Sequence, residues 1–394
     1  MIIDRKIETI LLALFAEYPI VTITGPRQSG KTTLCRKVFP HMAYANLEAP
    51  DTRQFALEDP RGFLGMYPDG AIFDEIQRVP HLPSYIQLFV DEHRKAGRFI
   101  ITGSRQFEVM EGITQSLAGR TAMLKLLPFS VEELSGKVDI SSVDKLLLTG
   151  FYPRIYDMNL DPTRAMGDYF ETYVERDVRR LVNVRDLSLF EKFVRLCAGR
   201  IGQVFNLQGL ANDVGISHTT ARGWLTILEA GYIVFLLRPY FGNVSKRLIK
   251  SPKLYFYDTG LASYLLGLEN ELHVTRDPLR GNIFENFVVM EALKFRFNRG
   301  KRGNMNFYKD SSGQEVDLVL EFGQNVFPVE IKAGATVTKD FFRGQKHFAK
   351  VNPELPWGSA IVYGGDTVQL RSDCKIFPAT RLHELLEDVD AHAN

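Results

Sequence analysis

The sequence has little cysteine, no long apolar run and almost no net charge. Its three cysteines among 394 residues, Cys35, Cys197 and Cys374, are far apart and match no metal-ligand spacing, which excludes a disulfide scaffold and favours a reducing, cytoplasmic compartment. No apolar run approaches the roughly 18–20 residues of a membrane span, so no membrane partner is expected. The apolar stretch 10–16 lacks a small-residue cleavage site and predicts an amphipathic helix rather than a secretion signal. A net charge of +1 leaves nucleic-acid binding open, because a basic patch fits within a neutral total.

The order of predicted elements changes along the chain, which is long enough for two to four domains. In the first third, apolar runs at 20–24, 71–73 and 98–102 alternate with helix-length segments. This alternation predicts an α/β fold with a parallel sheet and helices on both faces. Beyond residue 128 the pattern turns to helices, and strands return only after a long helix that begins near Gly281. We therefore expect a core at 1–135, a helical lid or linker at 136–200, a helix-turn-helix unit at 201–258 and an α/β end domain at 259–394.

A glycine-rich loop follows the first predicted strand and opens a helix. Residues 25–32 fit the pattern G-x-x-x-x-G-K-[ST] in the strand–loop–helix context of a phosphate-binding P-loop. The glycines let the backbone approach phosphate oxygens, Lys31 is expected to reach the β- and γ-phosphates, and Thr32 to ligate Mg²⁺. The alternative, a simple glycine turn, would give this pattern by chance in about one chain in a hundred of this size. The expected ATP-binding residues are Gly25, Pro26, Arg27, Gln28, Ser29, Gly30, Lys31, Thr32 and Thr33.

Two acids close the second predicted strand. Asp74 is expected to hold Mg²⁺ with Thr32, and Glu75 to orient or deprotonate a water that attacks the γ-phosphate. The alternative is an acidic turn at the end of a strand, which the upstream P-loop disfavours. Ser104 follows the third predicted strand at the same edge and is a candidate γ-phosphate sensor, although a turn residue explains it nearly as well.

These motifs carry a family resemblance. The P-loop, the string 73–78, the strand end 101–104 and Leu-Ala-Gly-Arg at 117–120 resemble the AAA-type ATPase domain of a bacterial and archaeal family. The segments 150–153, 173–177 and 257–260 resemble its C-terminal region, which is known as DUF4143. The resemblance implies ATP binding and a role linked to nucleic acid. AAA-type ATPases usually take an arginine from a neighbouring subunit, so a homo-oligomer is expected. Arg105 and Arg120 are candidates for that arginine finger, and the alternative for each is an ordinary surface arginine.

The middle of the chain predicts a winged helix. Residues 207–217 are typical of a helix and a glycine turn, and Ser217 is the expected N-cap of a second helix with apolar residues at i, i+3, i+4 spacing. The stretches 232–237 and 253–257 would form the wing. Five basic residues and no acid lie between Arg238 and Lys253, which suits contacts with DNA phosphates, while His218, Thr219 and Arg222 would face outward. The alternative is a module for contacts with an unidentified protein partner.

The end of the chain places acids and a lysine on neighbouring predicted elements. Glu330 and Lys332 share one face of a predicted strand, and a hairpin would bring Asp317 beside Glu330. With Glu285 from the preceding helix, these acids predict a possible second divalent-metal site, in which Lys332 would assist a water. This order of residues resembles the PD-(D/E)xK nuclease fold, although Val316 stands where the motif has proline. The alternative for the end domain is that it binds DNA without cutting it. For the whole chain, the alternative is a protein that binds ATP as a switch without hydrolysing it. The tail from His383 carries four acids and no Lys or Arg, and is expected to fray.

Overall fold

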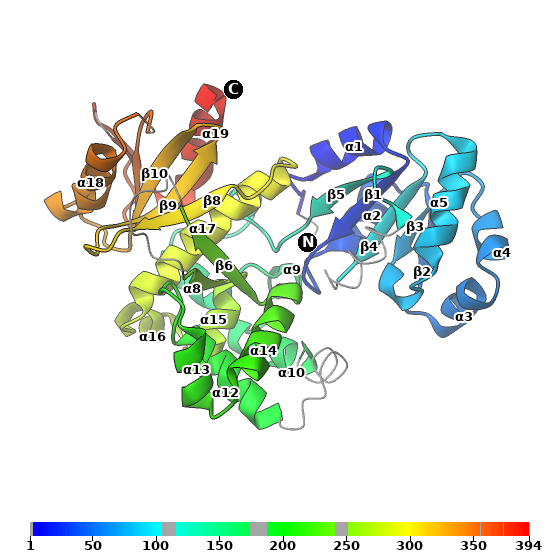
Figure 1. Cartoon of the computed structure of the whole chain (residues 1–394), viewed down its shortest axis with the longest axis horizontal. Coiled ribbons are helices and arrows are strands. Elements are labelled where there is room, and N and C mark those ends of the chain that lie inside the picture. The colour runs from blue at the N-terminus through cyan, green and yellow to red at the C-terminus, as the bar shows by residue number, and fades with distance from the viewer. Residues whose placement is uncertain are drawn as a thin grey trace. The chain divides into compact units, whose positions relative to one another are not determined.

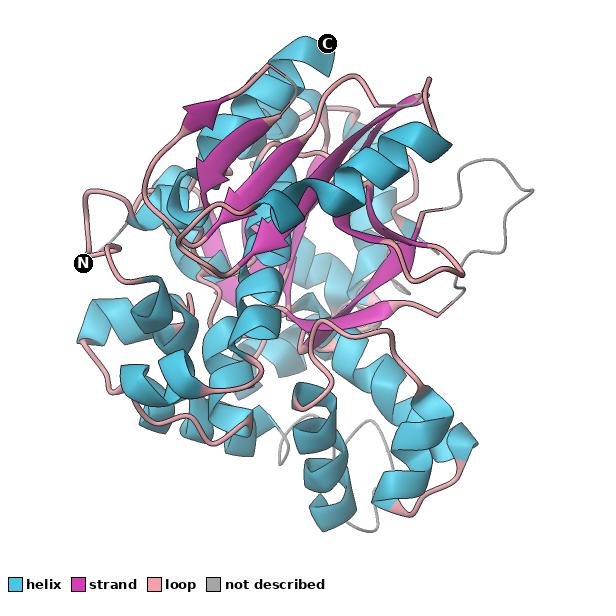
Figure 2. Cartoon of the chain, turned by 90° about the vertical axis from the view of Figure 1, so that its left-hand side faces the viewer, coloured by secondary structure: helices cyan, strands magenta, loops and turns pink. Residues whose placement is uncertain are grey.

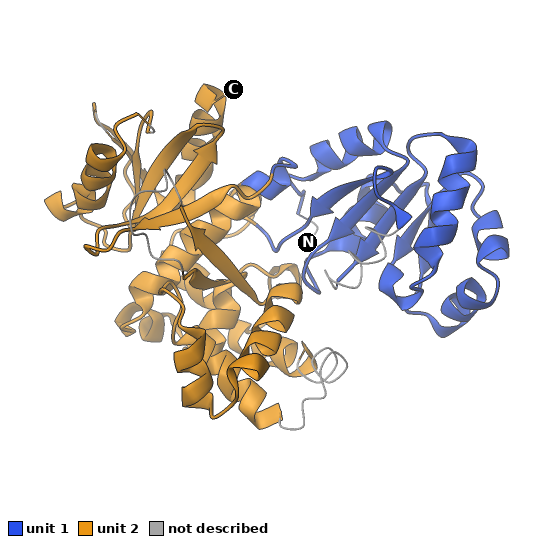
Figure 3. Cartoon of the chain, in the orientation of Figure 1, with its two compact units in different colours: residues 1–129, 296–301 blue, residues 130–295, 302–394 orange. Residues whose placement is uncertain are grey.

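The chain divides into two compact units (Figure 3). Unit 1 comprises residues 1–129 and 296–301, and unit 2 comprises residues 130–295 and 302–394. The predicted segments 136–200, 201–258 and 259–394 all lie in unit 2, and the boundaries between them stay predictions. The structure, a computed structural model, describes residues 3–104, 116–173, 187–240, 251–354, 356–372 and 374–393.

Unit 1 is built on a parallel sheet of five strands with the order β2-β3-β4-β1-β5 (Figure 1). The predicted parallel α/β core is therefore confirmed. The three predicted strands correspond to β1, β3 and β4, whereas β2 and β5 are additional. The strands are β1 (Ile20–Thr24), β2 (Ala43–Asn46), β3 (Ala71–Asp74), β4 (Phe99–Gly103) and β5 (Thr121–Lys125).

Helices cover both faces of this sheet because alternate strand residues point to opposite sides. On one face Phe73 and Phe99 pack against α3, α4 and α5. On the other face Val21 and Ile100 pack with side chains of α1 and α2. The helices are α1 (Glu8–Glu17), α2 (Lys31–Val38), α3 (Pro50–Glu58), α4 (Pro60–Gly65) and α5 (Leu82–His93).

Unit 2 begins with helices and contains the predicted helix-turn-helix elements. The turn between α13 and α14 is made by Gly215 at a φ of 90°, and the Ser217 hydroxyl caps α14 by accepting a hydrogen bond from the Thr220 N–H at 3.0 Å. The helices are α7 (Val131–Leu134), α8 (Val143–Thr149), α9 (Pro153–Met158), α10 (Pro162–Tyr173), α12 (Leu187–Ala198), α13 (Leu207–Val214), α14 (His218–Ala230), α15 (Thr259–Leu265), α16 (Glu271–Arg276), α17 (Arg280–Asn298), α18 (Arg343–Val351) and α19 (Leu382–Ala393).

One mixed sheet of eight strands runs through unit 2 (Figure 2, magenta) in the order β12-β13-β11-β10-β9-β8-β6-β7. The antiparallel ribbon of β6 and β7 directly follows α14, and β6 also pairs with β8. The predicted ribbon thus continues into the sheet of the end region. The strands are β6 (Val234–Pro239), β7 (Lys253–Phe256), β8 (Met305–Lys309), β9 (Glu315–Phe322), β10 (Asn325–Lys332), β11 (Ala360–Tyr363), β12 (Gln369–Leu370) and β13 (Lys375–Pro378).

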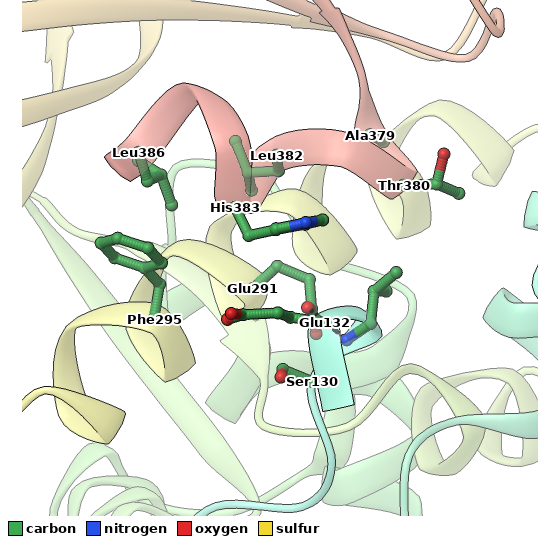
Figure 4. A pocket seen from close by; sticks show the side chains of 10 residues that line it. Ser130, Glu132, Glu291, Phe295, Ala379, Thr380, Leu382, His383 and Leu386 are labelled. Atoms are coloured by element: carbon green, nitrogen blue, oxygen red, sulfur yellow. Dashed lines mark hydrogen bonds between the residues drawn. The ribbon is translucent and has the colours of Figure 1, made fainter. Parts of the chain in front are cut away.

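The C-terminal tail is helical, so the expectation that it frays was wrong. Helix α19 buries Leu382, Leu385, Leu386 and Val389, which recur at helical spacing on one face. Figure 4 shows Leu382 and Leu386 beside Phe295 of α17 around a small hollow. The four acids of the tail therefore lie on a helix held by its apolar stripe.

Within the described ranges, no helix is long and apolar enough to cross a membrane.

Candidate functional site

The P-loop has the backbone that close contact with phosphate requires. Gly25 follows β1 directly at a φ of 152°, and a Cβ atom there would lie 2.1 Å from the Leu126 carbonyl oxygen, so only glycine fits. Gln28 and Gly30 also have positive φ values, of 59° and 92°. This sequence of left-handed residues turns the chain from the strand into α2.

The start of α2 suits an anion. Its N-cap is Gly30, no side chain of the described residues caps its first turn, and that turn holds no acid. The Ser29 hydroxyl is buried without a hydrogen-bond partner among the described residues. Backbone N–H groups at a helix start together with an unsatisfied hydroxyl form a cradle for phosphate oxygens, so the residues fit the expected nucleotide.

Lys31 is buried and donates hydrogen bonds to two carbonyl oxygens of its own loop, at 3.0 Å to Gly25 and 2.8 Å to Pro26. Burial lowers the pKa of Lys31 to about 8, against the opposing attraction of Glu75 and Asp74. At pH 7 the ammonium form therefore still dominates, and a phosphate oxygen is a stronger acceptor than either carbonyl.

Asp74 lies where Thr32 can share a metal ion with it. The Thr32 hydroxyl donates to Asp74 Oδ2 at 2.7 Å, and the Tyr44 hydroxyl donates to the same oxygen at 2.8 Å. The Thr102 hydroxyl donates to Asp74 Oδ1. Three hydroxyl donors thus hold the carboxylate at the carboxyl edge of β3, next to the start of α2.

Glu75 directly follows Asp74 and adopts a left-handed conformation with a φ of 59°. Its Oε2 atom accepts hydrogen bonds from the Ser104 hydroxyl at 3.0 Å and from the Gln77 amide. Its backbone N–H donates to the Thr102 hydroxyl at 3.4 Å. The structure therefore brings Ser104 to Glu75 and holds the Glu75 carboxylate between two side-chain donors.

The arginine-finger candidates do not join this cluster. Arg105 lies outside the described residues. Arg120 precedes β5, and Thr121 pairs with Ile20 at the start of β1, so Arg120 lies at the sheet edge opposite the P-loop. There it makes a two-pronged ion pair with Asp91, at 2.6 Å from Nε to Oδ1 and 2.8 Å from Nη2 to Oδ2.

Two residues near the P-loop were not predicted from the sequence. The buried Arg5 guanidinium donates to the Ser29 carbonyl at 2.8 Å and to the Leu127 carbonyl at 2.7 Å. It thereby ties the P-loop to the segment after β5. Tyr44, on the unpredicted strand β2, contacts Asp74, and no motif marks either residue in the sequence.

The predicted hairpin of the end region is present. β9 and β10 are antiparallel, and their register runs to the pair Leu318–Val329, so Asp317 and Glu330 are the next residues on the two strands. Asp317 Oδ2 accepts a hydrogen bond from the Ile331 N–H at 2.8 Å, and the Lys332 ammonium lies 2.6 Å from Glu330 Oε1 and 3.4 Å from Asp317 Oδ2. Burial, reinforced by the negative charge of Asp317, raises the pKa of Glu330 above its ordinary value.

The same cluster contains a lysine that was expected to contact DNA. The Lys253 ammonium lies 2.7 Å from Glu285 Oε1 and 3.9 Å from Asp317 Oδ1, and it also pairs with Glu315. Its side chain is 3% exposed. Lys253 is therefore unavailable for phosphate contact, because it lies inside unit 2 among carboxylates. Of the other basic residues of this stretch, Arg238 is exposed and those within 241–250 lie outside the described residues.

Within the described residues, the acids of the expected second metal site are not arranged as a metal-ligand group. In the parts of the chain that the structure describes, no group of three or more His, Cys, Asp or Glu side chains is placed to hold a metal ion. Glu285, Asp317 and Glu330 are close to one another, but lysine ammonium groups lie between them.

The outward face of α14 is polar. Thr219, Arg222, Gly223 and Thr226 are exposed, and Glu229, the single acid of this fully described helix, is half-buried. His218, which was expected to face outward, is half-buried as well.

Known families match three segments of the chain. The model described as an AAA domain matches residues 17–135, and two domains of unknown function, DUF8612 and DUF4143, match residues 140–272 and 280–382. An uncharacterized protein of Mycobacterium tuberculosis is 31% identical over 351 residues, which cover 88% of this chain and 77% of that protein. An uncharacterized protein of Methanocaldococcus jannaschii is 21% identical over 384 residues, covering 83% and 78%.

Among solved structures, a Walker-type ATPase of Pyrococcus abyssi is 17% identical with a TM-score of 0.44, and covers 67% of this chain and 96% of that one. AMPPCP-bound DnaA from Aquifex aeolicus is 16% identical with a TM-score of 0.31, covering 57% and 85%. The mycobacterial protein matches most of this chain at 31% identity, and an AAA segment precedes a DUF4143 segment here. These two findings identify the family. The chain belongs to the bacterial and archaeal family of AAA-type proteins in which a P-loop AAA domain is followed by a DUF4143 region.

Proposed function

We propose that the chain binds ATP with Mg²⁺ and hydrolyses it. The observation that carries this proposal is the arrangement at one sheet edge: the P-loop follows β1, Asp74 ends β3 beside Thr32, and Glu75 is held by Ser104. A non-hydrolysing ATP switch would need the P-loop and Asp74 but not a carboxylate positioned next to them. The oriented Glu75 therefore favours turnover.

Each residue of this edge has a distinct part. The N–H groups at the start of α2 and the Lys31 ammonium bind the phosphates. Thr32 and Asp74 hold Mg²⁺, which when bound neutralises charge on the β- and γ-phosphate oxygens. Glu75 accepts a proton from, or orients, the attacking water, while Ser104 and Gln77 keep its carboxylate directed.

Phosphate release over many turnovers tests hydrolysis. Lys31→Ala should abolish nucleotide binding, whereas Glu75→Gln should retain binding and slow turnover by about 10²–10⁴-fold, the usual contribution of a general base. Glu92→Gln makes the same chemical change at an exposed position of α5 and should leave the rate unchanged. Unaltered hydrolysis in both site variants would refute the assignment, and nucleotide binding without multiple turnover in the wild type would establish the switch.

We further propose that α13, α14 and the β6–β7 ribbon form a winged helix that binds DNA. The acid-free outward face of α14 supports this proposal, because acids there would repel phosphates. Of the five basic residues expected to contact DNA phosphates, Lys253 is buried and therefore does not contribute. The rival is a module for contacts with a protein partner.

DNA affinity that falls steeply with salt tests the proposal. Arg222→Ala should weaken binding and reduce the slope of log affinity against log salt by about one, as expected for the loss of one phosphate contact. Arg164→Ala removes the same charge from an exposed position of α10 and should have no effect on that slope. Absence of any salt-dependent DNA binding by the wild type would favour the protein-contact module instead.

A further inference from the structure

Four carboxylates and three ammonium groups meet on the sheet of unit 2. Glu285 comes from α17, Glu315 and Asp317 from β9, and Glu330 from β10. Lys253 contacts the first three, Lys332 contacts Asp317 and Glu330, and Lys309 lies 2.5 Å from Glu315 Oε2.

The position of Lys253 within this group is central. Its ammonium lies among Glu285, Glu315 and Asp317, which come from two different elements. Carboxylates that converge from a helix and a strand are the usual surroundings of a divalent cation bound by oxygen ligands. Here the positive charge at their centre belongs to a side chain of β7.

A tyrosine and helix α18 also contact the carboxylates of this group. The Tyr255 hydroxyl donates to Glu285 Oε1 at 2.6 Å, so one oxygen of Glu285 accepts from both Lys253 and Tyr255. On the side of α18, a Cβ atom at Gly344 would lie 2.2 Å from the Glu315 carbonyl oxygen and 2.8 Å from Glu330 Oε2. The helix therefore packs directly against the cluster, at a position that only glycine allows.

We infer that the Lys253 ammonium takes the place of a divalent metal ion in the end region, so that Glu285, Glu315 and Asp317 form a metal-free ion cluster. Three adjacent carboxylates, of which Asp317 is buried and Glu285 and Glu315 are half-buried, would repel one another without a cation. The ammonium offsets part of that charge and donates hydrogen bonds. The cluster then joins β7 to α17 and β9 as a structural clamp. DNA cleavage by these residues is not expected, because an ammonium group, unlike a divalent metal ion, cannot bind water or a phosphate oxygen as a ligand.

Removal of the ammonium tests the inference. The full chain without nucleotide is titrated with Mn²⁺, the free ion being measured by electron paramagnetic resonance, in a Lys31→Ala background that weakens ion binding at the P-loop. Lys253→Met keeps most of the side-chain volume, and we expect it to melt at a lower temperature and to gain one Mn²⁺ site. Mn²⁺ should raise its melting temperature, and the site should disappear in Lys253→Met/Asp317→Asn.

Two comparisons make the result decisive. Lys309→Met removes an ammonium from the same Glu315 but leaves Lys253 in place, and it should gain no Mn²⁺ site. While Lys253 is intact, the chain should bind the same number of Mn²⁺ ions with and without Asp317→Asn. Mn²⁺ binding that depends on Asp317 in the presence of native Lys253 would overturn the inference, and so would a folded Lys253→Met variant that binds no ion. Neither comparison replaces Lys253, and neither depends on ATP hydrolysis.

Discussion

Glu75 holds a backbone conformation that few residues other than glycine adopt. A left-handed φ costs about 1–2 kcal/mol for a residue with a Cβ atom, so the surrounding contacts must compensate for it. Here the backbone N–H is bonded to Thr102 and the carboxylate to Ser104. Such strain at the end of a strand directs the side chain away from the turn, toward the edge where the P-loop lies.

Arg5 stabilises the P-loop from outside the motif, and its replacement should affect both folding and nucleotide affinity. Arg5→Ala leaves the Ser29 and Leu127 carbonyls without this charged donor, which should destabilise unit 1 by about 2–4 kcal/mol. Because Ser29 belongs to the loop, we expect ATP affinity to fall roughly tenfold. Thermal denaturation and equilibrium nucleotide binding measure the two effects.

Arg61→Ala is the matched control, since it removes a positive charge at an exposed position of α4 and should change neither quantity. Arg5→Lys retains the charge but cannot bridge two carbonyls with a planar group, so it should restore only part of the affinity. If Arg5→Ala lowers stability without changing ATP affinity, Arg5 supports the fold but does not position the loop.

For single residues, the sequence is informative where the residues belong to a short local motif. Thr32 and Asp74 were expected to act together because a P-loop and a strand-ending acid have local patterns, and the structure places the two side chains in contact. Lys253 was misread as a DNA contact because its partners lie more than 30 positions away and come together only when the sheet forms.

At the scale of elements, α14 carries a glycine that the fold does not require. Gly223 is exposed in the middle of the helix, and a Cβ atom added there meets nothing within 4 Å. Glycine in a helix interior costs about 0.5–1 kcal/mol relative to alanine. Because Gly223 weakens the helix and no packing contact requires it, we interpret it as a position where another molecule comes close to the helix backbone.

Gly223→Ala should therefore stabilise the chain by about 0.5–1 kcal/mol and at the same time weaken DNA binding. Differential scanning fluorimetry and a DNA titration at fixed salt measure the two changes. Gly281→Ala, an exposed glycine of α17 that also has open space, is the control and should leave DNA affinity unchanged. Tighter or equal DNA binding by Gly223→Ala would show that α14 does not make the close contact.

Elements with strong periodicity were predicted well, and the misses have physical causes. β2 reads Ala-Tyr-Ala-Asn and β5 Thr-Ala-Met-Leu-Lys, which lack the β-branched runs of β1 and β4, and both lie at the edges of the sheet. The expectation for the tail rested on its acids alone, whereas the helical spacing of Leu382, Leu385, Leu386 and Val389 predicts the buried face that α19 has.

At the scale of the whole molecule, the sequence predicted separate units at 201–258 and 259–394, whereas strands from both segments belong to one sheet. The pairing of β6 with β8 and the contact of Lys253 with Glu285 join the segments matched by DUF8612 and DUF4143 within unit 2. Pairings between strands so far apart along the chain have no local signal in a sequence. Separate winged-helix and end domains were therefore natural expectations from pattern alone.

Activity should depend on a neighbouring subunit if Arg120 is the finger. Arg120 lies at the sheet edge opposite its own P-loop, beyond the length of β1, so within one chain it cannot reach the phosphates. We therefore expect the ATPase rate per subunit to rise with protein concentration, and Arg120→Ala to lower that rate by about 10³-fold or more. Arg94→Ala, at an exposed position after α5, should leave the rate unchanged.

Mixing two inactive variants separates a shared site from a self-contained one. An Arg120→Ala subunit keeps Glu75, and a Glu75→Gln subunit keeps Arg120, so a mixed assembly contains complete sites wherever the two meet in the right order. Equal mixtures should therefore recover a substantial fraction of wild-type phosphate release, although each variant alone is nearly inactive. Mixing Arg120→Ala with Lys31→Ala should also recover activity, because Lys31→Ala still offers its arginine. Activity that is independent of concentration, with no recovery on mixing, would place the complete site within one chain and exclude Arg120 from it.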